Sequence, residues 1–153
     1  LRIPRAEAQG FIDRYFERFP GIRAYMDATK KFAKDNLYVQ TLFGRKIHTP
    51  EINAKGPSAG FAGRAAINAP IQGTAADVIR RAMVRMEDAI ADLPATMLLQ
   101  VHDELLFEVD AAAVDTLITR ARDVMEGACA PAVKLDVPLV VDAGQGANWA
   151  EAH

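Results

Sequence analysis

The stretch that decides the fold is MLLQVHDELLFEV, residues Met97–Val109, in which two apolar runs flank a short charged segment. Runs of such strand-forming residues predict two β-strands, and the segment between them predicts a turn. Charged side chains are costly inside an apolar strand unless they are paired, so a turn accounts for their position. The stretch therefore predicts a β-hairpin with an acidic tip made of His102, Asp103 and Glu104.

The two carboxylates of this acidic tip, on Asp103 and Glu104, are candidate metal ligands. Hard cations such as Mg²⁺ bind oxygen ligands, and strands give those ligands a stiff support. Mg²⁺ usually takes another carboxylate or substrate phosphates as well, and the neighbouring sequence offers neither. The alternative is a solvated acidic turn, because Asp is common in exposed turns.

Helical patterns surround the hairpin. Apolar residues recur at helical spacing in four segments, which are residues 3–20, 22–36, 61–92 and 111–129. The first two segments predict a helical hairpin with Phe11, Tyr15 and Phe19 in its core. Pro70 lies inside the third segment and predicts a kink in a long helix, since proline removes one backbone hydrogen bond.

Three further segments complete the predicted fold. Short β-like runs on both sides of Phe43-Gly44 predict a second hairpin, and residues 50–60 predict a loop. Residues 137–146 predict a last strand that enters a Gly-rich turn. This order indicates an α+β fold, in which a helical hairpin and a long kinked helix pack on a small antiparallel sheet that contains the acidic hairpin.

Charge is distributed unevenly along the 153 residues. Residues 1–85 contain fifteen Lys and Arg and seven Asp and Glu, whereas residues 86–153 contain three and thirteen. The basic half predicts an anionic partner, with nucleic acid first, and two salt-bridged subdomains are the alternative. No apolar run approaches the roughly 20 residues of a membrane span. The single cysteine, Cys129, excludes an internal disulfide and fits a reducing compartment.

A polar stripe on the long helix is the second candidate site. Arg64, Asn68 and Gln72 follow one another at i, i+4 and i+8, so they share one helical face, and the residues between them include several alanines. Arg, Asn and Gln side chains hydrogen-bond the edges of bases, and small neighbours let another molecule come close. A plain polar surface stripe is the alternative.

Four stretches together resemble bacterial A-family DNA polymerases. Residues 100–109, QVHDELLFEV, resemble the family's third polymerase motif, and residues 64–83, RAAINAPIQGTAADVIRRAM, resemble the helix before it. Residues 38–53, YVQTLFGRKIHTPEIN, are similar to the preceding hairpin and loop, and residues 135–153 resemble the C-terminus of these enzymes. The resemblance runs through essentially the whole chain in order.

The resemblance implies a function for the acidic tip. It makes the chain the C-terminal part of a template-directed DNA polymerase that extends a primer 3′ end with deoxynucleoside triphosphates. Asp103 would be a catalytic ligand of two Mg²⁺ ions, Glu104 would support that metal site, and His102 would lie near the primer terminus. Residues 1–60 would form part of the fingers subdomain and residues 61–153 the palm.

The resemblance also assigns partners. Arg64, Asn68 and Gln72 would contact primer–template DNA, largely in the minor groove, where all correct pairs display similar acceptors. The remaining partner would be the rest of the polymerase chain, with no membrane, in the cytoplasm at the nucleoid.

Two departures from the family pattern matter. Family members usually carry Glu where this chain has Gly63, which affects how Arg64 is oriented. The first metal-binding aspartate and the nucleotide-gripping fingers helix would precede this chain, so we expect the 153 residues alone to be inactive. A non-catalytic nucleic-acid-binding module and a metal-dependent hydrolase that uses Asp103 and Glu104 are the competing hypotheses.

Overall fold

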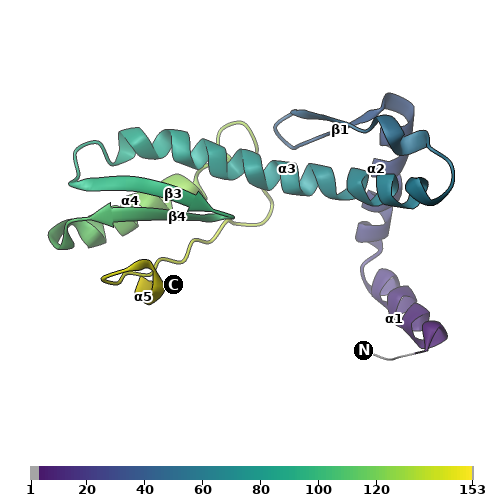
Figure 1. Ribbon diagram of the computed structural model, residues 1–153, viewed down its shortest axis with the longest axis horizontal. Coiled ribbons are helices and arrows are strands. Elements are labelled where there is room, and N and C mark those ends of the chain that lie inside the picture. Colours follow the sequence, from purple (N-terminus) through teal and green to yellow (C-terminus); the bar gives the residue numbers. More distant parts are fainter. Residues whose placement is uncertain (1–3, 153) are drawn as a thin grey trace. The chain divides into compact units, whose positions relative to one another are not determined.

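The computed structural model describes residues 4–152, which divide into two compact units at the Ile71–Gln72 junction. Mixed helices and two antiparallel two-stranded sheets confirm the predicted α+β class (Figure 1). The helices are α1 (Arg5–Arg18), α2 (Pro20–Asn36), α3 (Pro57–Ala89), α4 (Val114–Glu126) and α5 (Trp149–Ala152), with short 3₁₀ helices η1 (Pro50–Asn53) and η2 (Ala111–Ala113). The strands are β1 (Tyr38–Gln40), β2 (Lys46–His48), β3 (Ala95–Val101) and β4 (Glu104–Val109). None of the described helices is long and apolar enough to cross a membrane.

The first unit, Leu1–Ile71, has a core of small and β-branched residues. The buried members come from α2, β1, η1 and α3, and they are Ala33, Val39, Ile52, Ala62 and Ala66. The buried core residues that α2 and α3 contribute are all alanines, namely Ala33, Ala62 and Ala66. The Tyr25 hydroxyl on α2 donates to the Ile67 carbonyl oxygen on α3 at 2.9 Å, which ties the two helices together.

The aromatic face of α1 differs from the prediction. Phe11, Tyr15 and Phe19 were expected in a core, but they are 52%, 50% and 47% exposed. Among the described residues, no buried core residue lies on α1. The aromatic rings contact sequence neighbours instead: the Tyr15 ring centroid lies 5.2 Å from that of Phe19, the residue that follows α1, and the Arg14 guanidinium lies 4.8 Å from the centre of the Phe11 ring.

The predicted hairpin around Phe43-Gly44 is confirmed. Strands β1 and β2 pair antiparallel, with Tyr38 opposite His48. Gly44 has a φ of 83°, a left-handed conformation that glycine adopts without a steric penalty. The predicted loop over residues 50–60 is shorter than expected, because η1 occupies its start and α3 already begins at Pro57.

Helix α3 runs without interruption through Pro70 for 33 residues. The helix continues on both sides of Pro70 although proline has no backbone N–H to donate, and the predicted kink at this residue stays a prediction. The division between the two compact units falls just after this proline, inside α3. The naming of residues 1–60 as fingers and 61–153 as palm concerns subdomain identity and stays a prediction.

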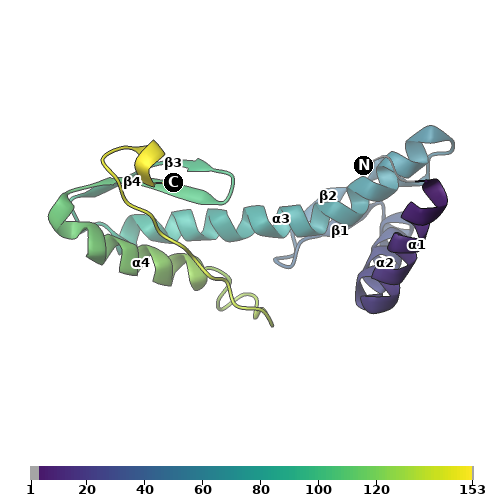
Figure 2. The same cartoon turned by 90° about the horizontal axis from the view of Figure 1, so that it is seen from below.

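The second unit, Gln72–His153, has a core of larger side chains. Met86, Ile90 and Leu117 are buried on α3, just past its end and on α4. Partly buried residues of the β3–β4 hairpin pack against them, namely Ala95, Met97, Leu105, Phe107 and Val109. Figure 2 shows the second half of α3 and α4 alongside this hairpin. One face of the hairpin is therefore anchored to two helices.

The predicted last strand at residues 137–146 is wrong, because the described structure has no strand there. Side chains of α4 take the hydrogen bonds that a neighbouring strand would have made. Arg122 Nε donates to the Val141 carbonyl oxygen at 3.1 Å, and the Val141 N–H donates to Glu126 Oε1 at 3.1 Å. The chain then turns at Gly144, where a Cβ would overlap the Ala152 carbonyl oxygen, and ends in the short helix α5.

Candidate functional site

The acidic tip is a tight turn between two paired strands. Val101 of β3 pairs with Glu104 of β4, so only His102 and Asp103 lie between the strands. His102 has a φ of 54°, in the left-handed region that histidine enters more readily than most residues. The Gln100 side-chain amide donates to the His102 carbonyl oxygen at 2.7 Å and fixes the turn from one side. The prediction of a hairpin at this stretch is confirmed, and Glu104 is the first residue of β4 rather than part of the turn.

A β-bulge near Leu98 sets which residues face the core close to the tip. Met97 pairs with Phe107, but the next pair is Leu99 with Leu106, so β3 holds one extra residue. Cross-strand partners lie on the same face of a sheet. Gln100 pairs with Leu105, which packs against the core, so both residues lie on the same face of the hairpin. The Gln100 amide extends from this face to the turn.

The base of the hairpin is packed, whereas its tip is open. Met97, Leu105 and Phe107 are partly buried against the core of the second unit. His102, Asp103 and Glu104 are all exposed. The charged residues therefore interrupt the apolar stretch at the point where the hairpin reaches solvent, beyond the packed part of its strands.

The two carboxylates fit part of a Mg²⁺ site. Adjacent Asp103 and Glu104 offer hard oxygen donors on a supported turn. Within residues 4–152, no group of three His, Cys, Asp or Glu side chains is placed to hold a metal ion. Mg²⁺ commonly takes one or two protein carboxylates and completes its shell with water and substrate phosphates, so two donors suit such a site without completing it.

The polar stripe is exposed on α3. Arg64 and Asn68 lie one turn apart in the first unit, and Ala66 and Ile67 beside them are buried. The hydrogen bond from Tyr25 to the Ile67 carbonyl oxygen holds this part of the helix against α2. Gln72, one turn further along α3, is also exposed and is the first residue of the second unit. The acidic tip belongs to the second unit.

Sequence reasoning missed a pocket in the first unit. It is lined by Lys30 and Lys34 from α2, by Ile52, Asn53 and Ala54, and by Ala59, Gly60, Gly63 and Arg64 at the start of α3. Gly63, which departs from the family pattern, lies on the wall of this pocket. The spacing of Lys30 and Lys34 at i and i+4 was the available signal, since such residues share one helical face.

A protein-family model described as DNA polymerase family A matches residues 1–151. This chain belongs to DNA polymerase family A. The DNA polymerase I of Rhizobium leguminosarum is 53% identical over 158 residues, and that of Pseudomonas aeruginosa is 49% identical over 156 residues. Both alignments cover 100% of this chain. The predicted resemblance to A-family DNA polymerases is confirmed.

A solved structure supports the fold of this family member. The POL domain of Pol1 from M. smegmatis, in complex with DNA primer-template and dNTP, matches with a TM-score of 0.91 and 41% sequence identity. The match covers 99% of this chain and 26% of that chain. The present chain spans only 16% and 17% of the length of the two curated relatives.

Proposed function

We propose that this family A chain carries a catalytic turn and a duplex-contacting helix of a template-directed DNA polymerase. The observation that supports the proposal most directly is the exposed acidic tip on a packed two-stranded support. The solved relative holds DNA primer-template and dNTP, and the same partners are proposed here. The remainder of the polymerase chain is the third partner, and the cytoplasm at the nucleoid is the proposed location.

Asp103 and Glu104 are the residues that would hold Mg²⁺. When bound, two such ions would activate the primer 3′-hydroxyl and stabilise the leaving pyrophosphate. The role of Asp103 is to present a carboxylate at a position that the tight turn and the Val101–Glu104 pair restrict. Glu104 would support that carboxylate from the first position of β4. Restricting a ligand in this way reduces the entropy lost when it engages its partner.

His102 and the polar stripe would position the nucleic acid. The left-handed φ of His102 sets the direction of its side chain at the tip, where it would lie near the primer terminus. Arg64, Asn68 and Gln72 would contact the minor groove of the primer–template. Minor-groove acceptors are similar in every correct pair, so this readout would accept all sequences and respond to a misfit.

The first test is primer extension by the complete polymerase that contains this chain, at millimolar Mg²⁺. We expect Asp103→Ala to lower the extension rate by about 100-fold or more, because losing a group that only supports a metal ligand already costs about 10–100-fold. Binding of primer–template should persist. Asp110→Ala is the matched control: it removes an exposed carboxylate just beyond the far end of β4 that makes no capping hydrogen bond, and it should extend like wild type.

Undiminished extension by Asp103→Ala would show that Asp103 is not a catalytic ligand. The acidic tip would then be a solvated turn, and salt-dependent DNA binding without catalysis would favour a nucleic-acid-binding module. Metal-dependent hydrolysis that Asp103→Ala abolishes would favour a hydrolase. The 153-residue chain by itself should give no extension, and a signal that survives Asp103→Ala would come from another source.

A further inference from the structure

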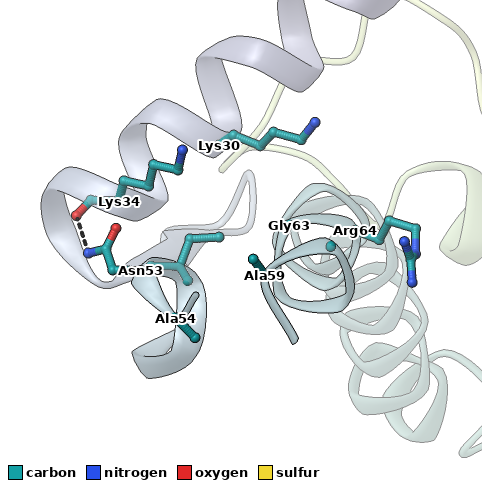
Figure 3. Close-up of a pocket in the computed structure, with 9 residues that line it drawn as sticks. Lys30, Lys34, Asn53, Ala54, Ala59, Gly63 and Arg64 are labelled. Carbon is teal, nitrogen blue, oxygen red and sulfur yellow. Dashed lines mark hydrogen bonds between the residues drawn. The ribbon is translucent and has the colours of Figure 1, made fainter. Parts of the chain in front are cut away.

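The pocket of the first unit has a cationic wall and a floor of small residues. It lies between α2, the segment that includes η1, and the first turns of α3, and its volume is about 610 Å³. Figure 3 shows Lys30 and Lys34 extending from α2, with Gly63 on the side of α3 that faces α2 and Arg64 on the far side of α3. We refer to this feature as the cationic pocket.

The charge of the cationic pocket is not balanced from within. No acidic residue is among its lining residues. Lys30 and Lys34 lie one helical turn apart, a spacing at which like charges destabilise each other. Lys31, between them in sequence, has a partner: its Nζ lies 2.6 Å from Asp35 Oδ2. The N-terminal end of the 33-residue helix α3 adds a positive partial charge, since its first N–H groups lack helical acceptors.

The small floor gives an anion access to this charge. Ala59, Gly60 and Gly63 line the side that α3 contributes. An ideal Cβ built at Gly63 would lie 3.8 Å from Lys30 Cε, so the Lys30 stem passes directly over this residue. A longer side chain at position 63 would enter the space between the two helices. Glycine at this position therefore keeps the pocket open.

We propose that the cationic pocket binds a phosphodiester of the primer–template backbone, with Lys30 and Lys34 as the phosphate-binding side chains. The inference rests on the proposed function, and it adds a contact outside the acidic tip and the polar stripe. The pocket is much larger than one phosphate group and is open at its surface, which suits a passing strand better than an enclosed free anion. It also shares the first turns of α3 with Arg64.

The test measures primer–template binding by the complete polymerase as a function of salt concentration. Each phosphate contact that is lost reduces the slope of log K against log salt by about one, irrespective of DNA sequence. We expect Lys30→Gln and Lys34→Gln each to reduce this slope by about one. Lys31→Gln is the matched control, because it removes the same charge from the same helix at an exposed, ion-paired position.

A second pair of variants tests the pocket without removing a lysine. Gly63→Glu places a carboxylate beside Lys30, whereas Gly63→Gln adds a neutral side chain of nearly the same volume. We expect Gly63→Glu to weaken binding and flatten the salt dependence more than Gly63→Gln. Equal effects of the two variants would mean that volume alone matters, which would overturn the role of charge.

Three further outcomes separate this inference from the proposed function. The inference would be overturned if Lys30→Gln and Lys34→Gln gave the same salt slope as Lys31→Gln. The result for Asp103→Ala would not be affected. If Lys30→Gln and Lys34→Gln bind inorganic phosphate or dNTP more weakly but keep the wild-type salt slope for DNA, the pocket binds a free phosphate compound. That result would overturn the DNA strand as its occupant. Reduced slopes together with full extension by Asp103→Ala would support the pocket and contradict the catalytic turn.

Discussion

The two units of this polymerase-family chain build their cores from side chains of different size. In the first unit Ala33 and Ala66 are fully buried, so α2 and α3 each contribute small side chains to the core. In the second unit Met86 and Leu117 are buried under a hairpin that adds Phe107. The first core therefore combines small side chains from several short elements, whereas the second uses large side chains that support the β3–β4 hairpin.

Charge follows the same division. The first unit contains twelve Lys and Arg against six Asp and Glu, and the second contains six against fourteen. A basic surface attracts phosphates, and an acidic one attracts cations. The uneven charge along the sequence therefore corresponds to a net charge difference between the two compact units. This difference agrees with the proposed nucleic-acid contact in the first unit and the proposed metal ligands in the second.

The largest expected effect comes from removing a large side chain from the core of the second unit. Met86 is 0% exposed, and Met86→Ala should lower the free energy of unfolding by about 2–5 kcal/mol because it leaves a cavity beneath the hairpin. Amide hydrogen exchange should accelerate in β3 and β4 and stay unchanged in β1 and β2. Val84→Ala, on the same helix at a position that is 67% exposed, should stay within about 0.5 kcal/mol of wild type. Equal loss of protection in both sheets would show that the units do not unfold separately.

A smaller effect is expected from enlarging a buried alanine in the core of the first unit. Ala66→Leu should destabilise by about 1–3 kcal/mol, since a fully buried alanine has no room for three more carbons. Repacking around the larger side chain should also weaken the hydrogen bond from Tyr25 to the adjacent Ile67 carbonyl oxygen, and the exchange of amides in the first unit should report this change. Ala65→Leu adds the same atoms at an exposed neighbour and should be nearly neutral. Similar destabilisation by both variants would contradict the close packing around Ala66.

The smallest expected effect is a pH dependence confined to the second unit. Hydrogen bonds from the Arg120 guanidinium lower the pKa of Asp92 below its usual value, with Arg120 Nη2 3.0 Å from Asp92 Oδ2. A carboxyl group with a lowered folded pKa stabilises the fold above its unfolded pKa of about 3.9, and this stabilisation is lost as pH falls through the folded pKa. Asp92→Asn should therefore lower the urea midpoint at pH 7, and the difference from wild type should vanish in strong acid.

The control for this titration is Asp88→Asn, which removes another exposed carboxylate near the end of α3. The urea midpoint of this variant should equal that of wild type at pH 7 and in strong acid. A difference between Asp92→Asn and wild type that persists unchanged into acid would mean that the carboxylate charge is not the source of the stabilisation.

Local patterns predicted much of the fold. Apolar runs around a charged break located β3 and β4 almost to the residue, and helical spacing located α2 and α4. Two predictions failed: the burial of the aromatic face of α1, inferred from helical spacing, and the strand at residues 137–146, inferred from an apolar run. Neither pattern says which other part of the chain will cover the apolar side chains. Val141 instead has its backbone groups bound by Arg122 and Glu126, a side-chain arrangement that no periodicity contains.

The candidate site was predicted to a similar extent. The adjacency of Asp103 and Glu104 and the spacing of Arg64, Asn68 and Gln72 are properties of the chain itself, so the sequence displays them. The cationic pocket depends on Lys30 meeting Gly63 across two helices, and these residues are far apart in sequence. Contacts of that kind become visible only after α2 and α3 are packed together.

The bulge at Leu98 affects the direction in which the acidic tip points but not which residues form it. A bulge bends its strand and increases the local twist. Deleting Leu98 would leave Leu99 opposite Leu106 and Val101 opposite Glu104 in a regular ladder, so the tip would keep all its residues and cross-strand pairs. It would nevertheless be aimed elsewhere. The one surplus residue of β3 thus acts on the orientation of the Asp103 carboxylate without touching it.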